Sequence, residues 1–476
     1  MGDSNDLRGA SYQTALDYLY GRVNYERASG GPPRGRDLNL ERMRELLARV
    51  DNPQQQFPAV HIAGTKGKGS TAAMVAGVLK AAGYRTGLYT SPHLDYLEER
   101  IQIDGQRCSP DELMALVDVL RPTVVSMDEE AERGGPLGTP TFFEITTAMT
   151  MLHFASQTVD VAVLEVGLGG RLDSTNVCRP VVTAITSISF DHVRQLGDTL
   201  AEIAAEKAGI IKPGAPIVCG VTGKEPRKVI RSIAAERGAP TCFVGEDYDF
   251  QHHQPNGLTL LPAALHYTSE LGGAWRLPDV QLGMIGAHQA ANAAVAIATL
   301  QQLELAGWRI PKDAIYRGLA ESRCPARIEI VSRRPTVVLD AAHNVASIDA
   351  LLAAVEAGLC ASQRILIFAA ARDKDVPGML KRLLESFDSI ILTQYLDNPR
   401  AVAPADAKEM LERGAYDADL SRKPAITTCE TPALAWQHCE TIVTPDALVC
   451  ITGSFFLAAE MRNLVTEASP LSATSM

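Results

Sequence analysis

The stretch FPAVHIAGTKGKGST at residues 57–71 decides the expected fold. The apolar run at 59–63 predicts a strand, the glycines after it predict a sharp turn, and residues 72–82 have the apolar spacing of a helix. Glycines let backbone N–H groups approach a polyanion, and a following helix adds the positive end of its dipole. The stretch therefore predicts a phosphate-binding loop between a strand and a helix.

The side chains of this loop fit the same prediction. Lys68 would supply a mobile positive charge for the outer phosphates, and the hydroxyl of Ser70 or Thr71 could reach a magnesium ion. The spacing departs from the usual P-loop, because only two residues separate Gly64 from Gly67 and a further glycine follows the lysine. The alternative is a glycine-rich turn that binds no ligand.

The composition is that of a soluble globular enzyme. The 476 residues suggest two or three domains, with 46% hydrophobic and 21% charged residues. The net charge of -11, without a block of Lys and Arg, argues against nucleic acid as the main partner. Nine cysteines without a C-x-x-C pair predict neither a disulfide framework nor a zinc module. Without an apolar leader or a long apolar stretch, we expect a cytoplasmic protein that does not enter a membrane.

Strands and helices are predicted to alternate along the chain. Two helices, at 12–20 and 39–50, precede the loop and are separated by a Gly/Pro-rich segment at 29–35. After the loop come predicted strands at 86–89, 159–166, 181–187 and 217–219, and predicted helices at 110–120, 142–155, 200–208 and 228–237. Such alternation with apolar strands predicts a parallel sheet covered on both faces.

The second half of the sequence predicts a second α/β unit. Residues 247–282 are irregular and suggest a hairpin excursion, and a long helix follows at 287–305. Alternation then resumes beyond a change of pattern near residue 322. We therefore predict an α/β fold: a P-loop ATPase domain with a mostly parallel sheet and N-terminal helices at 1–322, and a smaller Rossmann-like domain at 323–476.

Several charged residues lie near the carboxyl ends of the predicted strands, where parallel sheets bind ligands. Glu165 ends a predicted strand and is followed by glycines, so it is placed to hold magnesium near the phosphates, or else to cap a turn. His192 follows the next strand beside Asp191, and Lys207 lies on the helix beyond. On their own, these could be a loop histidine with a local partner and a solvated lysine.

Nine segments, in order over nearly the whole chain, resemble the Mur ligase superfamily and within it the folylpolyglutamate synthase and dihydrofolate synthase family. The segments are GTKGKGST (64–71), YTSPHL (89–94), TFFEITTAMT (141–150), LEVGLGGRLDSTN (164–176), DHVRQLGDTLAEIAAEKAGIIKPG (191–214), AHQAANAAVA (287–296), LDAAHN (339–344), ARDKD (371–375) and TGSFFLAAE (452–460).

The resemblance implies an ATP site and a metal site. The implied ATP-binding residues are Gly64, Thr65, Lys66, Gly67, Lys68, Gly69, Ser70, Thr71, Asn292, Arg327 and Asp340. Two magnesium ions are implied at Ser91, Glu165, His192 and Lys207, with Lys207 carried as a carbamate made from CO2. Carbamate formation turns a cation into an anionic oxygen ligand, which a hard metal prefers, and it requires a neutral amine.

The resemblance also implies the organic substrate site. The implied pterin-site residues are Thr141, Phe142, Phe143, Glu144, Leu172, Asp173 and Ser174. A flat heterocycle suits phenylalanine stacking and a carboxylate that receives its N–H donors, although one of the two phenylalanines could simply pack in the core. His343 and the region of Ser454 are expected to face the incoming amino acid. The implied catalytic residues are Lys68, Glu165, His192, Lys207 and His343.

Three positions, in two segments, depart from the family pattern. Lys66 stands where the loop commonly has Asn, which adds a charge near the phosphates. Cys324 and Ala326 replace a more usual Trp and Gly at the predicted domain junction, although Arg327 is retained. The first change bears on nucleotide binding and the second on the conformation of the linker.

We predict an ATP-dependent carboxylate–amine ligase that adds L-glutamate to dihydropteroate or a reduced folate through an acyl phosphate. Such an enzyme serves folate biosynthesis and one-carbon metabolism, and by resemblance we expect a monomer. Three alternatives stay open: a Mur-type amino-acid ligase acting on a UDP-linked peptidoglycan precursor, a P-loop kinase or NTPase, and a non-catalytic nucleotide-binding module.

Overall fold

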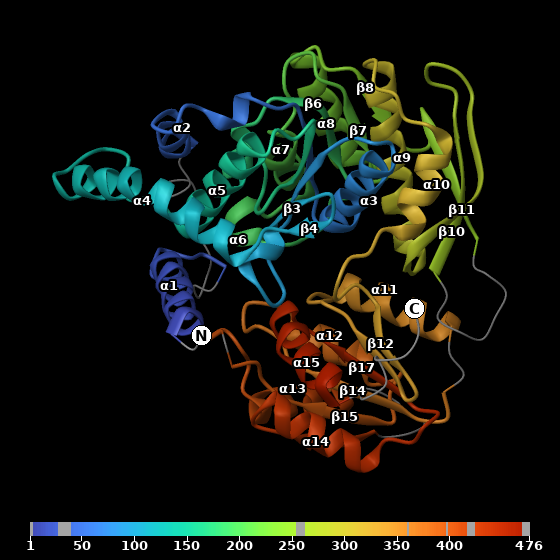
Figure 1. The fold of residues 1–476 in the computed structure, drawn as a ribbon. Coiled ribbons are helices and arrows are strands. Elements are labelled where there is room, and N and C mark those ends of the chain that lie inside the picture. Colours follow the sequence, from blue (N-terminus) through green and yellow to red (C-terminus); the bar gives the residue numbers. More distant parts are fainter. Residues whose placement is uncertain are drawn as a thin grey trace. The chain divides into compact units, whose positions relative to one another are not determined.

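The computed structural model describes residues 3–26, 40–253, 262–358, 361–396, 398–416 and 424–468. The chain divides into two compact units, each an α/β arrangement (Figure 1). The first contains Met1–Gln251, Leu265–Gln281 and Ala290–Arg323, and the second contains His252–Ala264, Leu282–Gln289 and Cys324–Met476. Each unit is described by itself, and the predicted ranges 1–322 and 323–476 stay a prediction.

An eight-stranded sheet forms the centre of the first unit, in the order β4-β3-β2-β5-β1-β6-β7-β8. Its strands are β1 (Ala59–Ala63), β2 (Thr86–Tyr89), β3 (Ile101–Ile103), β4 (Gln106–Arg107), β5 (Val161–Glu165), β6 (Pro180–Ile185), β7 (Ile217–Cys219) and β8 (Thr241–Phe243). The pairs from β2 to β8 are parallel, while β3 and β4 pair antiparallel at one edge. Every residue of β1, β2 and β5 is buried, as expected for strands covered on both faces.

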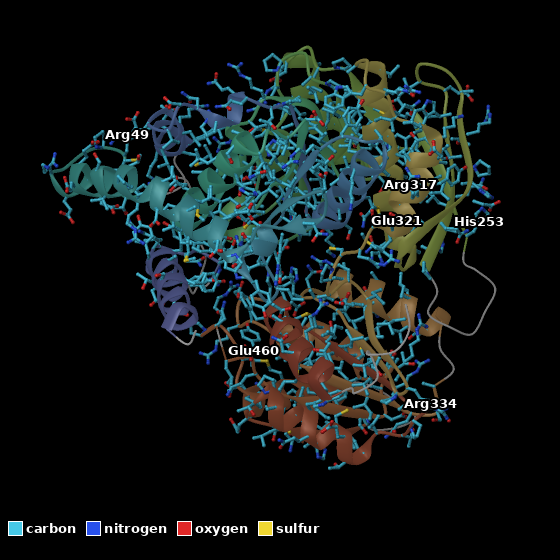
Figure 2. The ribbon with its side chains drawn as sticks, viewed as in Figure 1. Arg49, His253, Arg317, Glu321, Arg334 and Glu460 are labelled. Atoms are coloured by element: carbon cyan, nitrogen blue, oxygen red, sulfur yellow. The ribbon has the colours of Figure 1, made fainter. Side chains whose placement is uncertain are left out.

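Helices and three short 3-10 segments surround this sheet. The helices are α1 (Asp3–Tyr20), α2 (Leu40–Ala48), α3 (Lys68–Ala81), α4 (Pro110–Glu132), α5 (Phe142–Ser156), α6 (Val193–Leu196), α7 (Leu200–Ala208), α8 (Lys224–Glu236), α9 (Ala287–Leu305) and α10 (Lys312–Glu321). The 3-10 segments are η1 (Pro53–Gln55), η2 (Leu97–Arg100) and η3 (Ser174–Val177). Helix α10 lies against α3, where the guanidinium of Arg317 donates to the carbonyl of Ala81 at 2.7 Å (Figure 2).

The second unit contains a six-stranded sheet in the order β12-β13-β17-β14-β15-β16. Its strands are β12 (Glu329–Arg333), β13 (Thr336–Leu339), β14 (Arg364–Phe368), β15 (Ser389–Leu392), β16 (Ala425–Thr428) and β17 (Leu448–Thr452), and its helices are α11 (Val345–Gly358), α12 (Val376–Leu383), α13 (Pro404–Tyr416), α14 (Pro432–Ile442) and α15 (Phe455–Ala468). Alternate residues of β14 enter different cores: Leu366 belongs to one buried cluster and Ile365 and Ile367 to another. Both faces of this sheet are therefore covered.

The structure confirms the predicted α/β class with mostly parallel sheets. The excursion expected at 247–282 is a three-stranded sheet of β9 (Tyr248–His253), β10 (Pro262–Ser269) and β11 (Trp275–Ile285), in the order β11-β10-β9. The predicted loop at 29–35 lies outside the described residues. In the described part of the chain, no helix combines the length and the apolar character needed to cross a membrane.

Several helices differ from their predicted extents. Helix α3 begins at Lys68 instead of residue 72, because the glycine-rich segment already adopts the first helical turn. Helix α4 continues past Pro122 to Glu132, since buried side chains such as Val124 and Met127 keep its apolar face packed. Helices α1 and α8 begin earlier than residues 12 and 228, and helices α6, α10 and α15 were not predicted.

Candidate active site

The phosphate loop lies at the carboxyl end of β1 and is held by the residues that follow β6. The backbone N–H groups of Thr65 and Lys66 donate to the carbonyl and the hydroxyl of Ser187 at 2.8 and 3.0 Å. The hydroxyl of Thr186 donates in turn to the carbonyl of Lys66 at 2.6 Å. The loop conformation therefore depends on the neighbouring strand as well as on its own glycines.

Gly67 is required by the path of the backbone. It has a φ of 80°, which glycine adopts without strain, and it precedes the first residue of α3. A Cβ at this position would overlap the side-chain amide of Asn292 on α9, so the predicted ATP-site residue Asn292 packs directly against the loop. Lys68 then starts α3, whose first N–H groups have no partner within the helix and can face an anion.

Glu165, Ser91 and the loop meet at adjacent strand ends. Glu165 ends β5 and is 5% exposed, and its Oε2 accepts the backbone N–H of Ser91 at 3.3 Å. A Cβ on Gly69 would lie 3.2 Å from the same oxygen. A buried carboxylate and a neighbouring hydroxyl beside a phosphate loop are oxygen donors of the kind that Mg²⁺ prefers, so these residues fit that ion.

Lys207 is buried on α7 in the same electrostatic environment. Burial and the positive charge of Lys68, opposed by Asp191, together lower the pKa of its ammonium group to about 7. A substantial fraction of neutral amine therefore exists near neutral pH. The motif segment contained Asp191, but its role as a counter-charge for Lys207 was not predicted.

His192 has a strained backbone at the start of α6. Its φ is 49°, a left-handed conformation that is uncommon outside glycine, and its backbone N–H donates to Asp191 Oδ1 at 3.0 Å. Its side chain is 43% exposed, with Nε2 3.8 Å from the same carboxylate oxygen. In the described residues, no three His, Cys, Asp or Glu side chains gather closely enough to hold a metal ion. The predicted ligand set instead combines Ser, Glu, His and a modified Lys.

The two phenylalanines predicted at the pterin site differ in exposure. Phe142 is fully buried, its ring stacks on that of Tyr20 with centroids 5.5 Å apart, and the guanidinium of Arg100 lies 5.2 Å from its centre. Phe143 is half-buried and lies beside Gly167, where a Cβ would be only 2.5 Å from the ring. Phe142 is therefore the core residue, and of the two only Phe143 is partly exposed.

Glu144 serves the local structure of α5. Its Oε2 accepts the backbone N–H and the hydroxyl of the N-cap residue Thr141, both at 2.8 Å. Arg42 Nε also lies 2.9 and 2.8 Å from its two oxygens. Both side chains are nearly fully buried, so this carboxylate is engaged without any ligand. Arg42 was not singled out in the sequence, because the apolar side chains around it on α2 indicate only core packing.

Asp173 organises the turn between β5 and β6. Its two oxygens accept the backbone N–H groups of Leu168 at 2.9 Å and of Thr175 at 3.0 Å. Burial raises the pKa of this carboxyl group, while those hydrogen bonds act in the opposite direction. Leu172 beside it is half-buried and Ser174 is buried.

The second unit contains the remaining predicted site residues. Asp340 follows β13 and is buried, and its oxygens accept the backbone N–H groups of Ile328 and Ala342, both at 2.9 Å. Burial raises the pKa of this carboxyl group and the half-buried Arg327 opposes the rise. His343 Nδ1 lies 3.0 Å from the carbonyl of Ala341, and Ser454 is buried beyond the end of β17.

Two models of protein families match the chain. Residues 62–300 match the Mur ligase middle domain, and residues 326–455 match the Mur ligase glutamate ligase domain. The chain is 35% identical over 455 residues to the dihydrofolate synthase/folylpolyglutamate synthase of Bacillus subtilis, covering 95% of this chain and 98% of that protein. The chain belongs to the folylpolyglutamate synthase and dihydrofolate synthase family of Mur ligases.

Solved structures of this family have the same fold. The folylpolyglutamate synthase of Mycobacterium tuberculosis complexed with ADP superimposes with a TM-score of 0.84 at 32% identity, covering 96% of this chain and 98% of that one. Escherichia coli FolC in complex with DHPP and ADP gives a TM-score of 0.78 at 27% identity, with the same coverage of both chains.

One departure from the family pattern has a visible structural consequence. Ala326 has a φ of 52°, and Ile328 has a φ of 50°, so the residues on both sides of Arg327 are left-handed. A glycine would adopt this conformation without strain, which explains physically why the family commonly has one at position 326.

Removing the Arg42 side chain should destabilise the folded protein strongly. We expect Arg42→Ala to lower the free energy of unfolding by about 3–5 kcal/mol, because it leaves the buried Glu144 carboxylate without its cation. Urea unfolding followed by circular dichroism measures the change. Arg44→Ala, an exposed arginine on the same helix, is the matched control and should change stability by less than about 0.5 kcal/mol. Equal losses in the two variants would contradict the role of the Arg42–Glu144 pair.

Proposed function

We propose that this enzyme is an ATP-dependent ligase that joins L-glutamate to the carboxyl group of dihydropteroate or a reduced folate. The observation that carries the proposal is the convergence of Lys68, Glu165 and Lys207 at the carboxyl edge of the first sheet, in a member of this family. ATP phosphorylates the substrate carboxylate to give an acyl phosphate and ADP. The glutamate amine then attacks, and phosphate leaves as the amide forms.

The chain contributes position and charge to both steps. The phosphate loop, Gly64–Thr71, donates backbone N–H groups to the ATP phosphates, with Lys68 as the mobile cation. Asn292 positions the loop through its contact at Gly67. Lys66 adds a second positive charge close to the phosphates. These groups stabilise charge that develops on the transferred phosphoryl group without having to reorganise.

Magnesium would be held by Ser91, Glu165, His192 and a carbamate on Lys207, as two ions. Bound there, it would neutralise phosphate charge during phosphoryl transfer. Burial of Lys207 and the proximity of Lys68 favour the neutral amine from which a carbamate forms. Asp191 supports the backbone at His192 and so orients the start of α6.

The pterin would bind beside Phe143, with Leu172, Ser174 and Thr141 around it. Phe142, Glu144 and Asp173 would support that surface, because their rings and oxygens are engaged inside the protein. In the second unit, Arg327 and Asp340 would bind ATP, and His343 and the Ser454 region would receive glutamate. The domain ranges 1–322 and 323–476, the monomeric state and the cytoplasmic location belong to the same proposal.

A substrate panel tests the function and its rival. Purified enzyme is given ATP, Mg²⁺ and glutamate with dihydropteroate, with tetrahydrofolate, or with a UDP-linked peptidoglycan precursor. We expect glutamate-dependent ADP release and a product heavier by one glutamyl residue with at least one of the two pterins. Turnover restricted to the UDP-linked precursor would establish the other Mur-type activity, and ADP release independent of glutamate would indicate an NTPase.

Lys68 should be essential for ligation but not for folding. We expect Lys68→Ala to lower kcat by about 10²–10³ or more, since it removes a positioned charge from the phosphoryl group. The matched control is Lys80→Ala, an exposed lysine in the last turn of the same helix, which should keep wild-type turnover. Both variants should retain the wild-type circular dichroism spectrum. Normal turnover by Lys68→Ala would remove the loop lysine from the mechanism.

Carbamylation of Lys207 is directly observable. With ¹³C-bicarbonate, we expect a carbamate carbon resonance in the wild-type enzyme that is absent from Lys207→Ala and present in Lys212→Ala, whose lysine also has a lowered pKa. Activity of Lys207→Ala should fall by about 10² or more and recover partly with short carboxylic acids that supply the missing oxygens. If Lys207→Ala is fully active and shows the same carbamate resonance as the wild-type enzyme, Lys207 is not the carbamylated residue.

A further inference from the structure

A cavity of about 600 Å³ lies at the edge of the first sheet opposite to the phosphate loop. Its walls come from α2, from η1 before β1, from the segment before β6 and from the segment before β7. These three strands are neighbours in the sheet, in the order β1-β6-β7. The cavity is therefore at their amino ends, whereas the loop and Glu165 are at carboxyl ends.

The wall is positively charged although the protein carries a net charge of -11. Arg44, Arg179 and Lys212 line the cavity, from three separate segments, and the described lining residues include no carboxylate. Arg44 pairs with Glu41 outside the lining. Lys212 Nζ donates to the backbone carbonyl of Asn176 at 2.8 Å, and neither Lys212 nor Arg179 has an ion-pair partner within the described part of the chain.

The positive charge of Arg44 acts unfavourably on Lys212. Burial lowers the pKa of the Lys212 ammonium group, the lining residue Cys178 opposes that shift, and the positive charges of Arg237, outside the lining, and of Arg44 add to it. A bound anion would reverse this repulsion. Because the cations come from different sides of the cavity, a ligand with more than one acidic group would match them best.

Two lining amides have an unused acceptor. Gln54 is 6% exposed and donates to Asn52 Oδ1 at 3.1 Å, and Asn176 is 4% exposed and donates to the carbonyl of Arg171 at 3.0 Å. The oxygen of each side chain is buried without a hydrogen-bond partner in the described residues. Both oxygens are inaccessible from the cavity, so these amides are part of its wall, fixed by the hydrogen bonds that they donate.

We propose that this cavity binds a small molecule that carries two or more acidic groups. Its volume lies within the roughly 300–1,000 Å³ of typical small-molecule sites. The cavity belongs to a single compact unit and shares no residue with the ATP, metal or pterin sites. The proposal therefore stands whether or not the ligase assignment holds.

The cavity is also connected to the pterin side of the sheet. Asn176 lies in η3, two residues after Ser174, and its Nδ2 donates to the carbonyl of Gly209 at 3.3 Å, just beyond the end of α7. Occupancy of the cavity would thus order the segment that joins the predicted pterin residues to the helix of Lys207.

The test is local hydrogen–deuterium exchange on the full chain without nucleotide. Two probes are titrated separately, γ-glutamyl-γ-glutamyl-glutamate and tripolyphosphate, to distinguish a polycarboxylate from a polyphosphate ligand. We expect exchange in segments 174–180 and 212–216 to slow several-fold with at least one probe. Protection at 64–71 is followed separately, because the phosphate loop can bind the same anions.

Variants assign the protection to the cavity. The double variant Arg44→Ala/Arg179→Ala should raise the probe concentration for half-maximal protection of 174–180 by about tenfold per charge removed. Gln55→Glu, an exposed and nearly isosteric change in the lining, should abolish the protection of this segment. Arg133→Ala, which removes an exposed arginine outside the lining, should leave the protection of 174–180 unchanged. Unchanged thermal midpoints and unchanged turnover at saturating substrate exclude misfolding. Absence of protection with both probes, or protection that persists in the double variant and in Gln55→Glu, would overturn the proposal.

Discussion

The parallel pairing of β5, β1 and β6 is the constraint on which the site depends. Ile62 pairs with Glu165 and Ala63 pairs with Ile185, so the ends of three strands stop at one edge. The phosphate loop, the buried carboxylate of Glu165 and the hydroxyls that support the loop all follow from that register. A shift of one residue would move Glu165 to the opposite face, because side chains alternate along a strand.

Burial of charge gives this edge its chemistry. Lys207 lies in a desolvated position close to a second lysine, and the resulting pKa of about 7 distinguishes it from an ordinary surface lysine. Asp191 partly compensates the positive charge, while its oxygen also holds the strained backbone at His192. The same residues therefore set both the electrostatics and the geometry of the site.

Internal contacts separate supporting residues from residues that can meet a ligand. Glu144 and Phe142 belong to one motif segment with Phe143, yet Glu144 is engaged by Arg42 and Phe142 by Tyr20. Of these three, only Phe143 is partly exposed. At the opposite edge of the sheet, positive side chains gather around a cavity whose described lining residues include no carboxylate. The two edges of one sheet thus offer two environments for anions.

The sequence by itself determined the α/β class, the loop between β1 and α3, and the family, because these follow from local apolar period, glycine placement and motif order. It did not determine the extent of α4, since buried Val124 and Met127 outweigh the stop signal of Pro122. Nor did it reveal the Arg42–Glu144 pair, the effect of Lys68 on Lys207, or the basic cavity. Those features join residues far apart along the chain, so only packing of the tertiary structure, which desolvates charges and fixes their distances, could decide them.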